Sequence, residues 1–403
     1  MAAGASESRP PESEPRPSES GLSVSVCRDT AAFGALREEW NRLHRSCAGA
    51  TPFQSHAWLH SWWLSYGGGR GSAGGLRIVL VRDVDNGDRL VAVAPLMRRL
   101  RPHPVLTPLG TAISDFSDVL VADGDRAADR ARALDALGAG LWRLARGAVI
   151  DFREVRPGAA VESLYGRWRG PRRRLDDSPC LELPAVPMDE LVGRLPRPRA
   201  QRARAKLRKM DALGIERRVV PAAETDASVR RLLDLHRLQW QERKVTTEHL
   251  RPRFAEHLTR SVGLMARAGD AVVTEFTLDG SVVAADLTFL SPHLAGGYLY
   301  GAHPRLRERK VDVAAMLLRS CTQYLHETEG GEARTCVLSL LRGSEPYKLH
   351  WRPEERVNQR LLLARRTTAP HLAALLADAR ARTWAKRARG AWRDRKERGG
   401  DPT

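Results

Sequence analysis

The chain of 403 residues has few cysteines, few aromatic residues and no long hydrophobic run. Its five cysteines are odd in number and never form a Cys-x-x-Cys pair, which argues against a disulfide framework and a cysteine zinc site and predicts a reducing, cytoplasmic location. The longest apolar runs, such as Leu90–Met97, are far shorter than the roughly 18 residues that a membrane-spanning helix needs. Residues 1–22 lack the apolar stretch of a signal peptide, and their Pro, Ser and Glu content predicts a disordered leader.

Several catalytic and metal-binding motifs are also missing. Neither Gly-x-Ser-x-Gly nor a Walker A motif occurs, which argues against a serine hydrolase and a P-loop enzyme. His56 and His60 are one helical turn apart, but no glutamate completes a His-Glu-x-x-His motif, so we expect a packed helix and no metal. Gly69–Gly74 matches Gly-x-Gly-x-x-Gly by letter, yet it follows a predicted helix and precedes a predicted strand. Because a dinucleotide site has the reverse order, we expect a loop there.

Basic residues are abundant, and nearly all of them are arginines. Lysine and arginine together number 66 and give a net charge of +18, yet only seven of them are lysines. Where lysine is retained, we expect a need for a compact ammonium group. The segment Arg194–Arg218, with ten basic and two acidic residues, is expected to form a helix over Arg199–Leu213 that contacts phosphate or is simply solvated. The segment Arg380–Arg398, with nine basic and two acidic residues, is expected to form a surface helix that could touch a membrane.

The predicted elements follow a similar order in the two halves of the chain. Each half has a helix and a β-hairpin, and the hairpin turns, Asn86–Gly87 and Asp279–Gly280, carry residue pairs that short turns favour. In the first half we expect strand Ser23–Cys27, helix Ser55–Tyr66, strands Leu76–Arg82 and Leu90–Pro95, helix Asp129–Arg146 and strand Cys180–Leu183. In the second half we expect helix Arg253–Ala268, strands Ala271–Leu278, Val282–Leu290 and Gly296–Gly301, helix Val311–Glu327, strands Thr335–Ser339 and Arg356–Ala364, and helix Pro370–Arg395.

This repetition predicts an α/β (α+β) fold with mixed sheets, built as two tandem domains. Hairpins, rather than strictly alternating βαβ units, are expected to form the sheets. The expected boundaries are a leader at 1–22, an N-terminal domain at 23–185, a C-terminal domain at 186–368 and a basic helical tail at 369–403.

The segment Leu340–Trp351 carries the densest group of chemically useful side chains. Ser344 is expected to cap a short helix. Arg342, Tyr347 and Lys348 would then lie near a helix start, where backbone N–H groups favour an anion. We therefore expect an anion-binding site with an accessible Lys348; the alternative is that Tyr347 packs and Lys348 is solvated.

The motif Arg-Gly-Ser-Glu-Pro-Tyr-Lys at residues 342–348 resembles the Arg-Gly-x-Glu-x-Tyr-Lys motif of CelD/BcsL-like proteins. These are members of the GNAT acyltransferase superfamily with a BioF-like acetyltransferase domain, and they are similar in build to FemAB-type tandem GNAT transferases. Looser matches in the same order extend the resemblance over about residues 23–365. They include Pro-Phe-Gln-Ser-His-Ala-Trp-Leu from Pro52, Ser-Asp-Phe from Ser114 and Tyr-Leu-Tyr-Gly from Tyr298.

The resemblance implies two GNAT-like domains and an enzyme that transfers an acetyl or acyl group from acyl-CoA. The implied acceptor is an amine or hydroxyl of a polysaccharide or cell-envelope precursor. This chemistry needs a base for the acceptor, donors to the oxyanion and a phosphate-binding helix start, but no metal. The roles so assigned are a base in Glu275 or Asp286, thiolate protonation by Tyr300 and Tyr347, donor binding by Arg342, Lys348 and Lys310, and substrate binding by Asp115 and Trp240.

One departure from the GNAT pattern lies in the pyrophosphate loop, (Gln/Arg)-x-x-Gly-x-(Gly/Ala). The nearest match begins at Arg309, and Asp312 replaces its glycine. A carboxylate there would repel phosphate, and its Cβ would hinder close approach, which argues against acyl-CoA. Two other functions therefore stay open. One is a FemAB-like aminoacyl-tRNA-dependent transferase, with the basic segment Arg194–Arg218 binding the tRNA; the other is a catalytically degenerate GNAT module that only binds.

Overall fold

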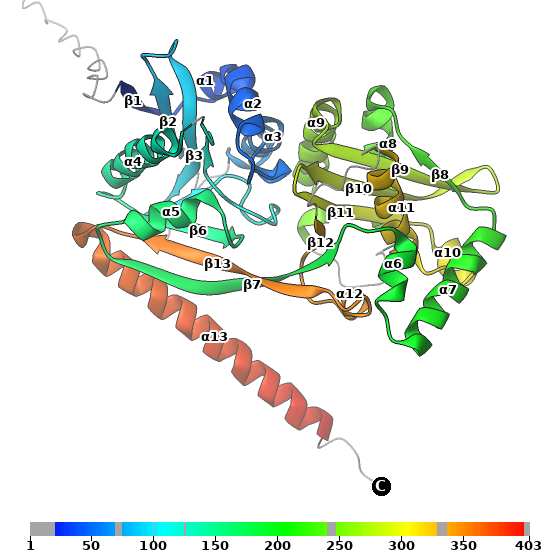
Figure 1. The fold of residues 1–403 in the computed structure, drawn as a ribbon. Helices are drawn as coiled ribbons and strands as arrows, with labels where there is room; N and C mark the ends of the chain where they lie inside the picture. The colour runs from blue at the N-terminus through cyan, green and yellow to red at the C-terminus, as the bar shows by residue number, and fades with distance from the viewer. Residues whose placement is uncertain are drawn as a thin grey trace, which may run out of the picture.

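The computed structural model describes residues 21–68, 75–100, 102–124, 126–239, 247–328 and 337–398. Within these residues one 13-stranded mixed sheet runs through both halves of the molecule (Figure 1), which confirms the predicted α/β class. In sheet order the strands are β1 (Leu22–Cys27), β2 (Leu76–Asp83), β3 (Arg89–Arg99), β4 (Val105–Pro108), β6 (Val149–Val155), β13 (Glu354–Leu363), β7 (Arg172–Pro184), β12 (Val337–Arg342), β11 (Leu294–Ala302), β10 (Ser281–Ser291), β9 (Ala271–Leu278) and β8 (Glu216–Val219), while β5 (Leu120–Val121) pairs with β3.

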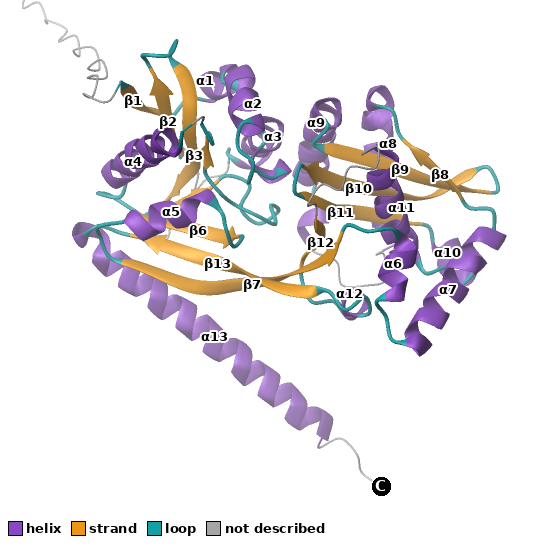
Figure 2. Ribbon diagram, in the orientation of Figure 1, coloured by secondary structure: helices purple, strands orange, loops and turns teal. Residues whose placement is uncertain are grey.

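The helices form two groups, one packed around the strands of each half of the molecule (Figure 2). The last helix, α13, runs beneath β7 and β13. The first group is α1 (Thr30–Ala35), α2 (Arg37–Arg45), α3 (His56–Tyr66), α4 (Ala127–Leu144) and α5 (Ala160–Arg167). The second is α6 (Met188–Gly193), α7 (Arg197–Ala212), α8 (Thr225–Gln239), α9 (Pro252–Ala268), α10 (Pro304–Glu308), α11 (Val313–Thr328) and α12 (Pro346–Leu349), and the chain ends in α13 (Ala369–Arg398). In the described residues, no helix combines the length and apolar character required to cross a membrane.

Both predicted hairpins are present. β2 pairs with β3 and β9 pairs with β10, each antiparallel. Asp279 and Gly280 have φ values of 52° and 74°, the left-handed conformation that a two-residue type I′ turn requires at both positions. The first turn is longer than the sequence pattern indicated, because residues 84–88 separate β2 from β3 and the positive φ values fall at Gly87 and Asp88.

Two long strands connect the halves of the molecule. β13 comes from the end of the chain, yet it lies between β6 and β7, and β7 in turn pairs with β12. The sheet therefore continues across the expected domain boundary at 185/186, which itself stays a prediction. Of the predicted leader, residues 1–20 lie outside the described residues, as does the loop Gly69–Gly74.

A cluster of aromatic rings fills the space between the halves. Phe53 and Trp58 from the first half contact Phe289 on β10, each with ring centroids 5.2 Å apart. Tyr298 on β11 stacks on Phe289, and its hydroxyl donates to the carbonyl oxygen of Ile113 at 2.9 Å. Burial of such large apolar surfaces is the main favourable term in folding, so this cluster fixes β10 and β11, the strands on which the site is built.

Candidate functional site

The site begins where two parallel strands separate. The pairing between β11 and β12 joins Leu294–Gly296 to Val337–Ser339 and stops there, although β11 continues to Ala302 and β12 to Arg342. Side chains from both strands, from α11 and from α12 line the space between them. Open ends of strands in α/β sheets are common ligand sites, because loops and helix ends converge there.

Two neighbouring cavities occupy this region. The smaller, of about 90 Å³, is lined mostly by apolar side chains of α11 and β12, together with Asp286, Tyr300, Tyr347 and Lys348. The larger, of about 610 Å³, lies at the start of α11 and is lined by Lys206, Arg307, Lys310 and Asp312 among others. Tyr300 lines both cavities, and the adjacent residues Val313 and Ala314 line one each. An elongated ligand could therefore place a polar end in one cavity and an apolar end in the other.

Asp286 lies on β10 directly opposite Tyr300 on β11, so the two side chains share one face of the sheet. The carboxyl is buried, and its partner is the Thr288 hydroxyl, which donates to Oδ2 at 2.7 Å. Burial raises the pKa of Asp286 to about 7, since the hydrogen bond from Thr288 offsets only part of the desolvation. A carboxyl with this pKa can accept a proton at neutral pH.

Glu275, the other predicted base, faces the opposite way. Its carboxylate is buried, and it accepts hydrogen bonds from Arg218 at 2.9 Å and from Ser228 at 2.7 Å and forms an ion pair with Arg231. Burial by itself raises the pKa of Glu275, but these donors outweigh it and hold the pKa below the usual value. A carboxylate stabilised in this way is a weak base, and Glu275 does not line either cavity.

Lys348 enters the smaller cavity from α12, but it is buried rather than accessible. Its Nζ donates to the Arg342 carbonyl oxygen at 2.7 Å and pairs with Glu345 Oε2 at 2.8 Å. The expectation of an accessible lysine is therefore wrong. So is the expected cap, because Glu345 and not Ser344 is the residue at the N-cap of α12. Tyr347, by contrast, is half-exposed at the cavity wall.

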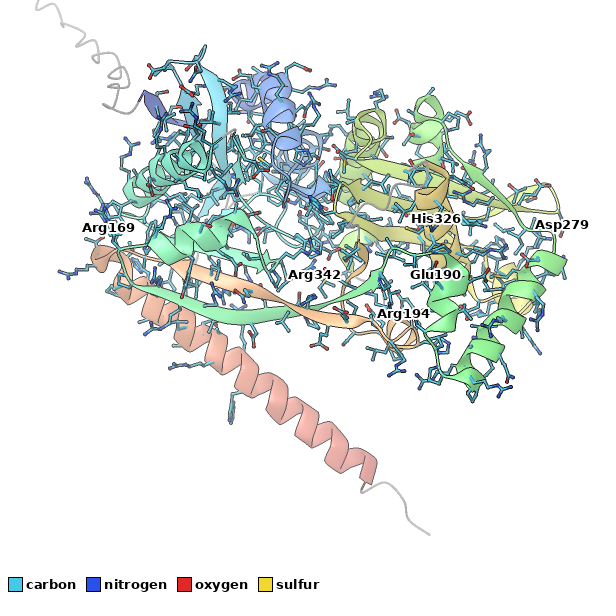
Figure 3. All side chains as sticks on the ribbon, viewed as in Figure 1. Arg169, Glu190, Arg194, Asp279, His326 and Arg342 are labelled. Atoms are coloured by element: carbon cyan, nitrogen blue, oxygen red, sulfur yellow. The ribbon has the colours of Figure 1, made fainter. Side chains whose placement is uncertain are left out.

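Arg342 lies in the middle of the molecule, where the two halves meet (Figure 3). Its guanidinium forms an ion pair with Asp115 and a second one with Glu154 at 3.0 Å. Asn358 donates to the Asp115 carbonyl oxygen at 3.2 Å and to Glu154 Oε2 at 3.1 Å. Arg342 and Asp115, both predicted to hold ligands, thus contact each other across the halves and do not line the two cavities; their ligand roles stay predictions. Trp240 lies outside the described residues.

The start of α11 carries a carboxylate. Asp312 Oδ1 accepts a hydrogen bond from the Ala315 backbone N–H at 3.1 Å, and Oδ2 pairs with Lys206 Nζ at 2.7 Å. The side chain therefore occupies a backbone donor that a phosphate would otherwise use. Lys206, Arg307 and Lys310 nevertheless outnumber Asp312 in the lining of the larger cavity, which leaves it suited to an anion.

Sequence reasoning missed three contributors to the site. Thr288 follows Asp286 by two positions, and this period-two spacing on a predicted strand could have identified it. The ion pair between Lys206 and Asp312 joins positions that are 106 residues apart, so no local sequence pattern could predict it. The apolar wall of the smaller cavity, including Leu317 and Leu318 of α11, has the same helical spacing as ordinary core. Among the described residues, no group of three or more His, Cys, Asp or Glu side chains could hold a metal ion.

Comparisons with known proteins concern the family of this part of the chain and its fold. Residues 197–349 match the family described as the acetyltransferase (GNAT) domain. The comparison with curated proteins returned no significant match. Among solved structures, the chain is similar to FemX, with a TM-score of 0.56 and 11% identity over 83% of this chain and 98% of that chain.

Two further solved structures have the same overall arrangement. A conserved protein of unknown function from Bacteroides thetaiotaomicron VPI-5482 gives a TM-score of 0.53 at 11% identity, covering 85% of this chain and 100% of that one. L-PGS from Bacillus licheniformis gives a TM-score of 0.50 at 12% identity, covering 88% of this chain and 97% of that one. At such identities the likeness concerns the fold. Residues 197–349, which contain both cavities, therefore form a GNAT acetyltransferase domain, and the enzyme class that this domain supports is an acyltransferase.

Proposed function

We propose that the protein transfers an acyl group from acyl-CoA to an amine or hydroxyl acceptor in the cleft between β11 and β12. The observation that carries this proposal is the position of Asp286. Its carboxyl is buried in the cavity between the diverging strands, opposite Tyr300, and its pKa is raised to about 7. A base with a pKa near the working pH is the most effective proton acceptor for an attacking amine or hydroxyl.

The two cavities divide the donor between them. The phosphates of the donor lie in the larger cavity, near Lys206, Arg307 and Lys310. The acyl group lies in the smaller cavity, against the apolar wall that includes Leu317 and Leu318. Pockets with an apolar wall and a few well-placed polar groups are typical of small-molecule sites.

The reaction then proceeds by direct attack. Asp286 takes the proton of the acceptor, directly or through one water, while the acceptor nitrogen or oxygen bonds to the thioester carbonyl carbon. Lys348 has three N–H donors, two of them engaged by Arg342 and Glu345, so a third is available for the developing oxyanion. The C–S bond breaks, and Tyr300 or Tyr347 protonates the leaving thiolate before regaining a proton from solvent.

The acceptor class follows from the motif at residues 342–348. Its resemblance to CelD/BcsL-like proteins with a BioF-like domain favours an amine or hydroxyl of a polysaccharide or cell-envelope precursor. The contacts that Arg342 and Asp115 make with each other do not support donor binding by Arg342 or substrate binding by Asp115.

A second candidate donor is an aminoacyl-tRNA. Two observations favour it: Asp312 occupies the Ala315 N–H at the start of α11, and Arg202, Arg204 and Arg208 lie exposed on α7 beside the larger cavity's Lys206. Contacts between such arginines and the phosphates of a nucleic acid weaken steeply as the salt concentration rises. Binding of charged tRNA that persists at about 0.2 M salt, without any binding of CoA, would favour this donor over acyl-CoA.

The experiment is a thiol-release assay with acetyl-CoA and a panel of amine and hydroxyl acceptors, run on wild type and Asp286→Asn. Asparagine keeps the size of the side chain but cannot accept the proton, so the rate should fall by about 10²–10⁴-fold while CoA affinity is unchanged. The matched control is Asp279→Asn, an exposed aspartate in the β9–β10 turn outside both cavities, which should retain full activity. Equal rates for wild type and Asp286→Asn would exclude Asp286 as the base, and turnover of any acceptor would exclude a module that only binds.

A further inference from the structure

The last helix, α13, leaves the body of the protein partway along its length. Its first turns are anchored: Leu372 and Leu375 are buried against Val105, Val149 and Leu362, and Thr368 just before the helix donates to the Ala145 carbonyl oxygen at 3.1 Å. Beyond Ala379 the described side chains are exposed, with 74% of Arg382 and 73% of Trp384 accessible. Figure 1 shows the helix continuing away from β7 and β13 toward the C-terminus.

The apolar residues of α13 form two stripes on opposite sides of the helix. The first, which packs on the body, is Leu372, Leu375 and Leu376, and the half-buried Ala379 follows on the same side. The second is Ala381, Trp384, Ala385, Ala388, Ala391 and Trp392, at spacings of three and four that define one arc about 120° wide. At about 100° per residue, the centres of the two stripes are about 180° apart. The second stripe is therefore not a continuation of the core-facing one.

Charges of one sign border the second stripe on both sides. One border carries Arg382, Lys386, Arg389, Arg393 and Lys396, and the other carries Arg380, Arg387 and Arg398. The acidic residues Asp394 and Glu397 fall on the opposite arc, and Arg395 falls on the arc of the stripe three residues beyond its last member, Trp392. A narrow apolar arc with tryptophans between two basic borders is the pattern of a helix that lies in the surface of an anionic bilayer.

We propose that residues 380–398 lie on an anionic lipid surface, with the apolar stripe toward the acyl chains and the basic borders among the headgroups. Two other occupants fit less well. In a second copy of this helix, the basic borders would face each other and repel. A nucleic acid would pair with the arginines but would leave the stripe with its two tryptophans in water. From Ala381 to Trp392 the stripe is about 17 Å long, and because it faces away from the arc that packs on the body, the body lies on the far side of the helix from the lipid. This inference does not depend on the proposed acyl transfer.

The test is co-sedimentation of the full chain with vesicles of phosphatidylcholine alone or with about 30% phosphatidylglycerol, at about 0.15 M salt. We expect binding to the anionic vesicles and little to the neutral ones. Replacing both tryptophans, Trp384→Ala with Trp392→Ala, should weaken binding by about tenfold or more, because the aromatic rings anchor the helix at the interface.

A variant of the same composition shows whether binding to the vesicles depends on the apolar stripe or on the positive charge alone. It exchanges Thr383 with Trp384 and Gly390 with Trp392, which keeps every charge and the residue content but moves both tryptophans to the basic and acidic arc. We expect it to lose binding as the alanine variant does, with an unchanged melting temperature. Wild-type binding by this variant, equal binding to neutral vesicles, or tight binding to duplex DNA that the tryptophan replacements leave intact would each overturn the proposal.

Discussion

Arg342 on β12 and Asp115 in the segment between β4 and β5, 227 positions apart, form an ion pair that joins the two halves of the molecule. Glu154 is the second partner of the same guanidinium, at 3.0 Å. Burial raises the pKa of Asp115 even though the positive charge of Arg342 opposes the shift. The ion pair with Arg342 therefore stabilises the buried Asp115 carboxylate, which would destabilise the folded protein if it had no cation beside it.

Removal of Arg342 should destabilise the protein strongly. In Arg342→Ala, Asp115 and Glu154 would remain as mostly buried carboxylates without their shared cation, so the free energy of unfolding should fall by about 3 kcal/mol. Urea denaturation measures the change. The control, Arg204→Ala on the exposed side of α7, should change it by less than about 0.5 kcal/mol. Similar small changes in both variants would show that the ion pair is not what joins the halves.

Asp286 should give the activity and the stability opposite dependences on pH. As the base it must be deprotonated, so the rate of acyl transfer should rise with pH up to about 7 and then level off. Its folded-state pKa is raised, so the folded state keeps the proton that the unfolded state has lost between pH 3.8 and about 7. Over that range the free energy of unfolding should fall by up to about 1.4 kcal/mol per pH unit relative to Asp286→Asn. The range from pH 6 to 8 extends about one unit on either side of that pKa. A rate of acyl transfer that stays constant over this range would contradict the assignment of Asp286 as the base.

Lys348 should matter for stability as well as for activity. Lys348→Met keeps the apolar stem but removes the hydrogen bond to the Arg342 carbonyl and the pair with Glu345, so we expect a loss of about 1–3 kcal/mol. Lys209→Met, at an exposed position of α7, is the matched control and should be nearly neutral. A neutral Lys348→Met would mean that the buried ammonium contributes nothing to the fold of α12, and thermal melts of the two variants decide the matter.

Asp312 should weaken the binding of an anionic donor. Asp312→Asn keeps an oxygen for the Ala315 N–H and removes a negative charge next to the larger cavity, which also frees Lys206. We expect CoA to bind about fivefold more tightly, as removal of one unfavourable charge contact allows. Calorimetry with CoA measures this, and Glu308→Gln, an exposed carboxylate on α10 outside the cavity lining, should leave the affinity as it is. Weaker binding by Asp312→Asn would show that the carboxylate assists the ligand instead.

Local sequence patterns predicted most of the elements because hairpin turns and apolar spacing are local properties. They could not choose between Glu275 and Asp286, which lie on neighbouring strands. The register pairs Glu275 with Ala285 and Asp286 with Thr274, so the two carboxyls point to opposite faces of the sheet. One face meets Arg231 of α8, and the other meets the cavity beside α11. This difference of a single register position decides which carboxyl can act as a base.

Contacts between the halves were equally hidden from the sequence. The motif around Arg342 and Lys348 marked the right segment, but the partners Asp115 and Glu154 lie far along the chain, and no spacing connects them. Burial of Lys348 depends on the turn at residues 343–345 and on its carbonyl acceptor, both of which are properties of the folded chain. Charge alone suggested that Lys348 is accessible, because ionised side chains are seldom buried without a partner.

The most direct test of the central claim, that an acyl-CoA donor binds in the GNAT domain between β11 and β12, is a thermal-shift titration with acetyl-CoA and free CoA. Wild type is compared with Lys310→Ala, which removes a cation from the larger cavity, and with Lys209→Ala, which removes one outside it. At 100 times its dissociation constant, the ligand should stabilise wild type and Lys209→Ala by about 2.7 kcal/mol. Lys310→Ala should need a higher concentration for the same shift. Absence of any shift at millimolar CoA, or an equal response from all three proteins, would contradict the account.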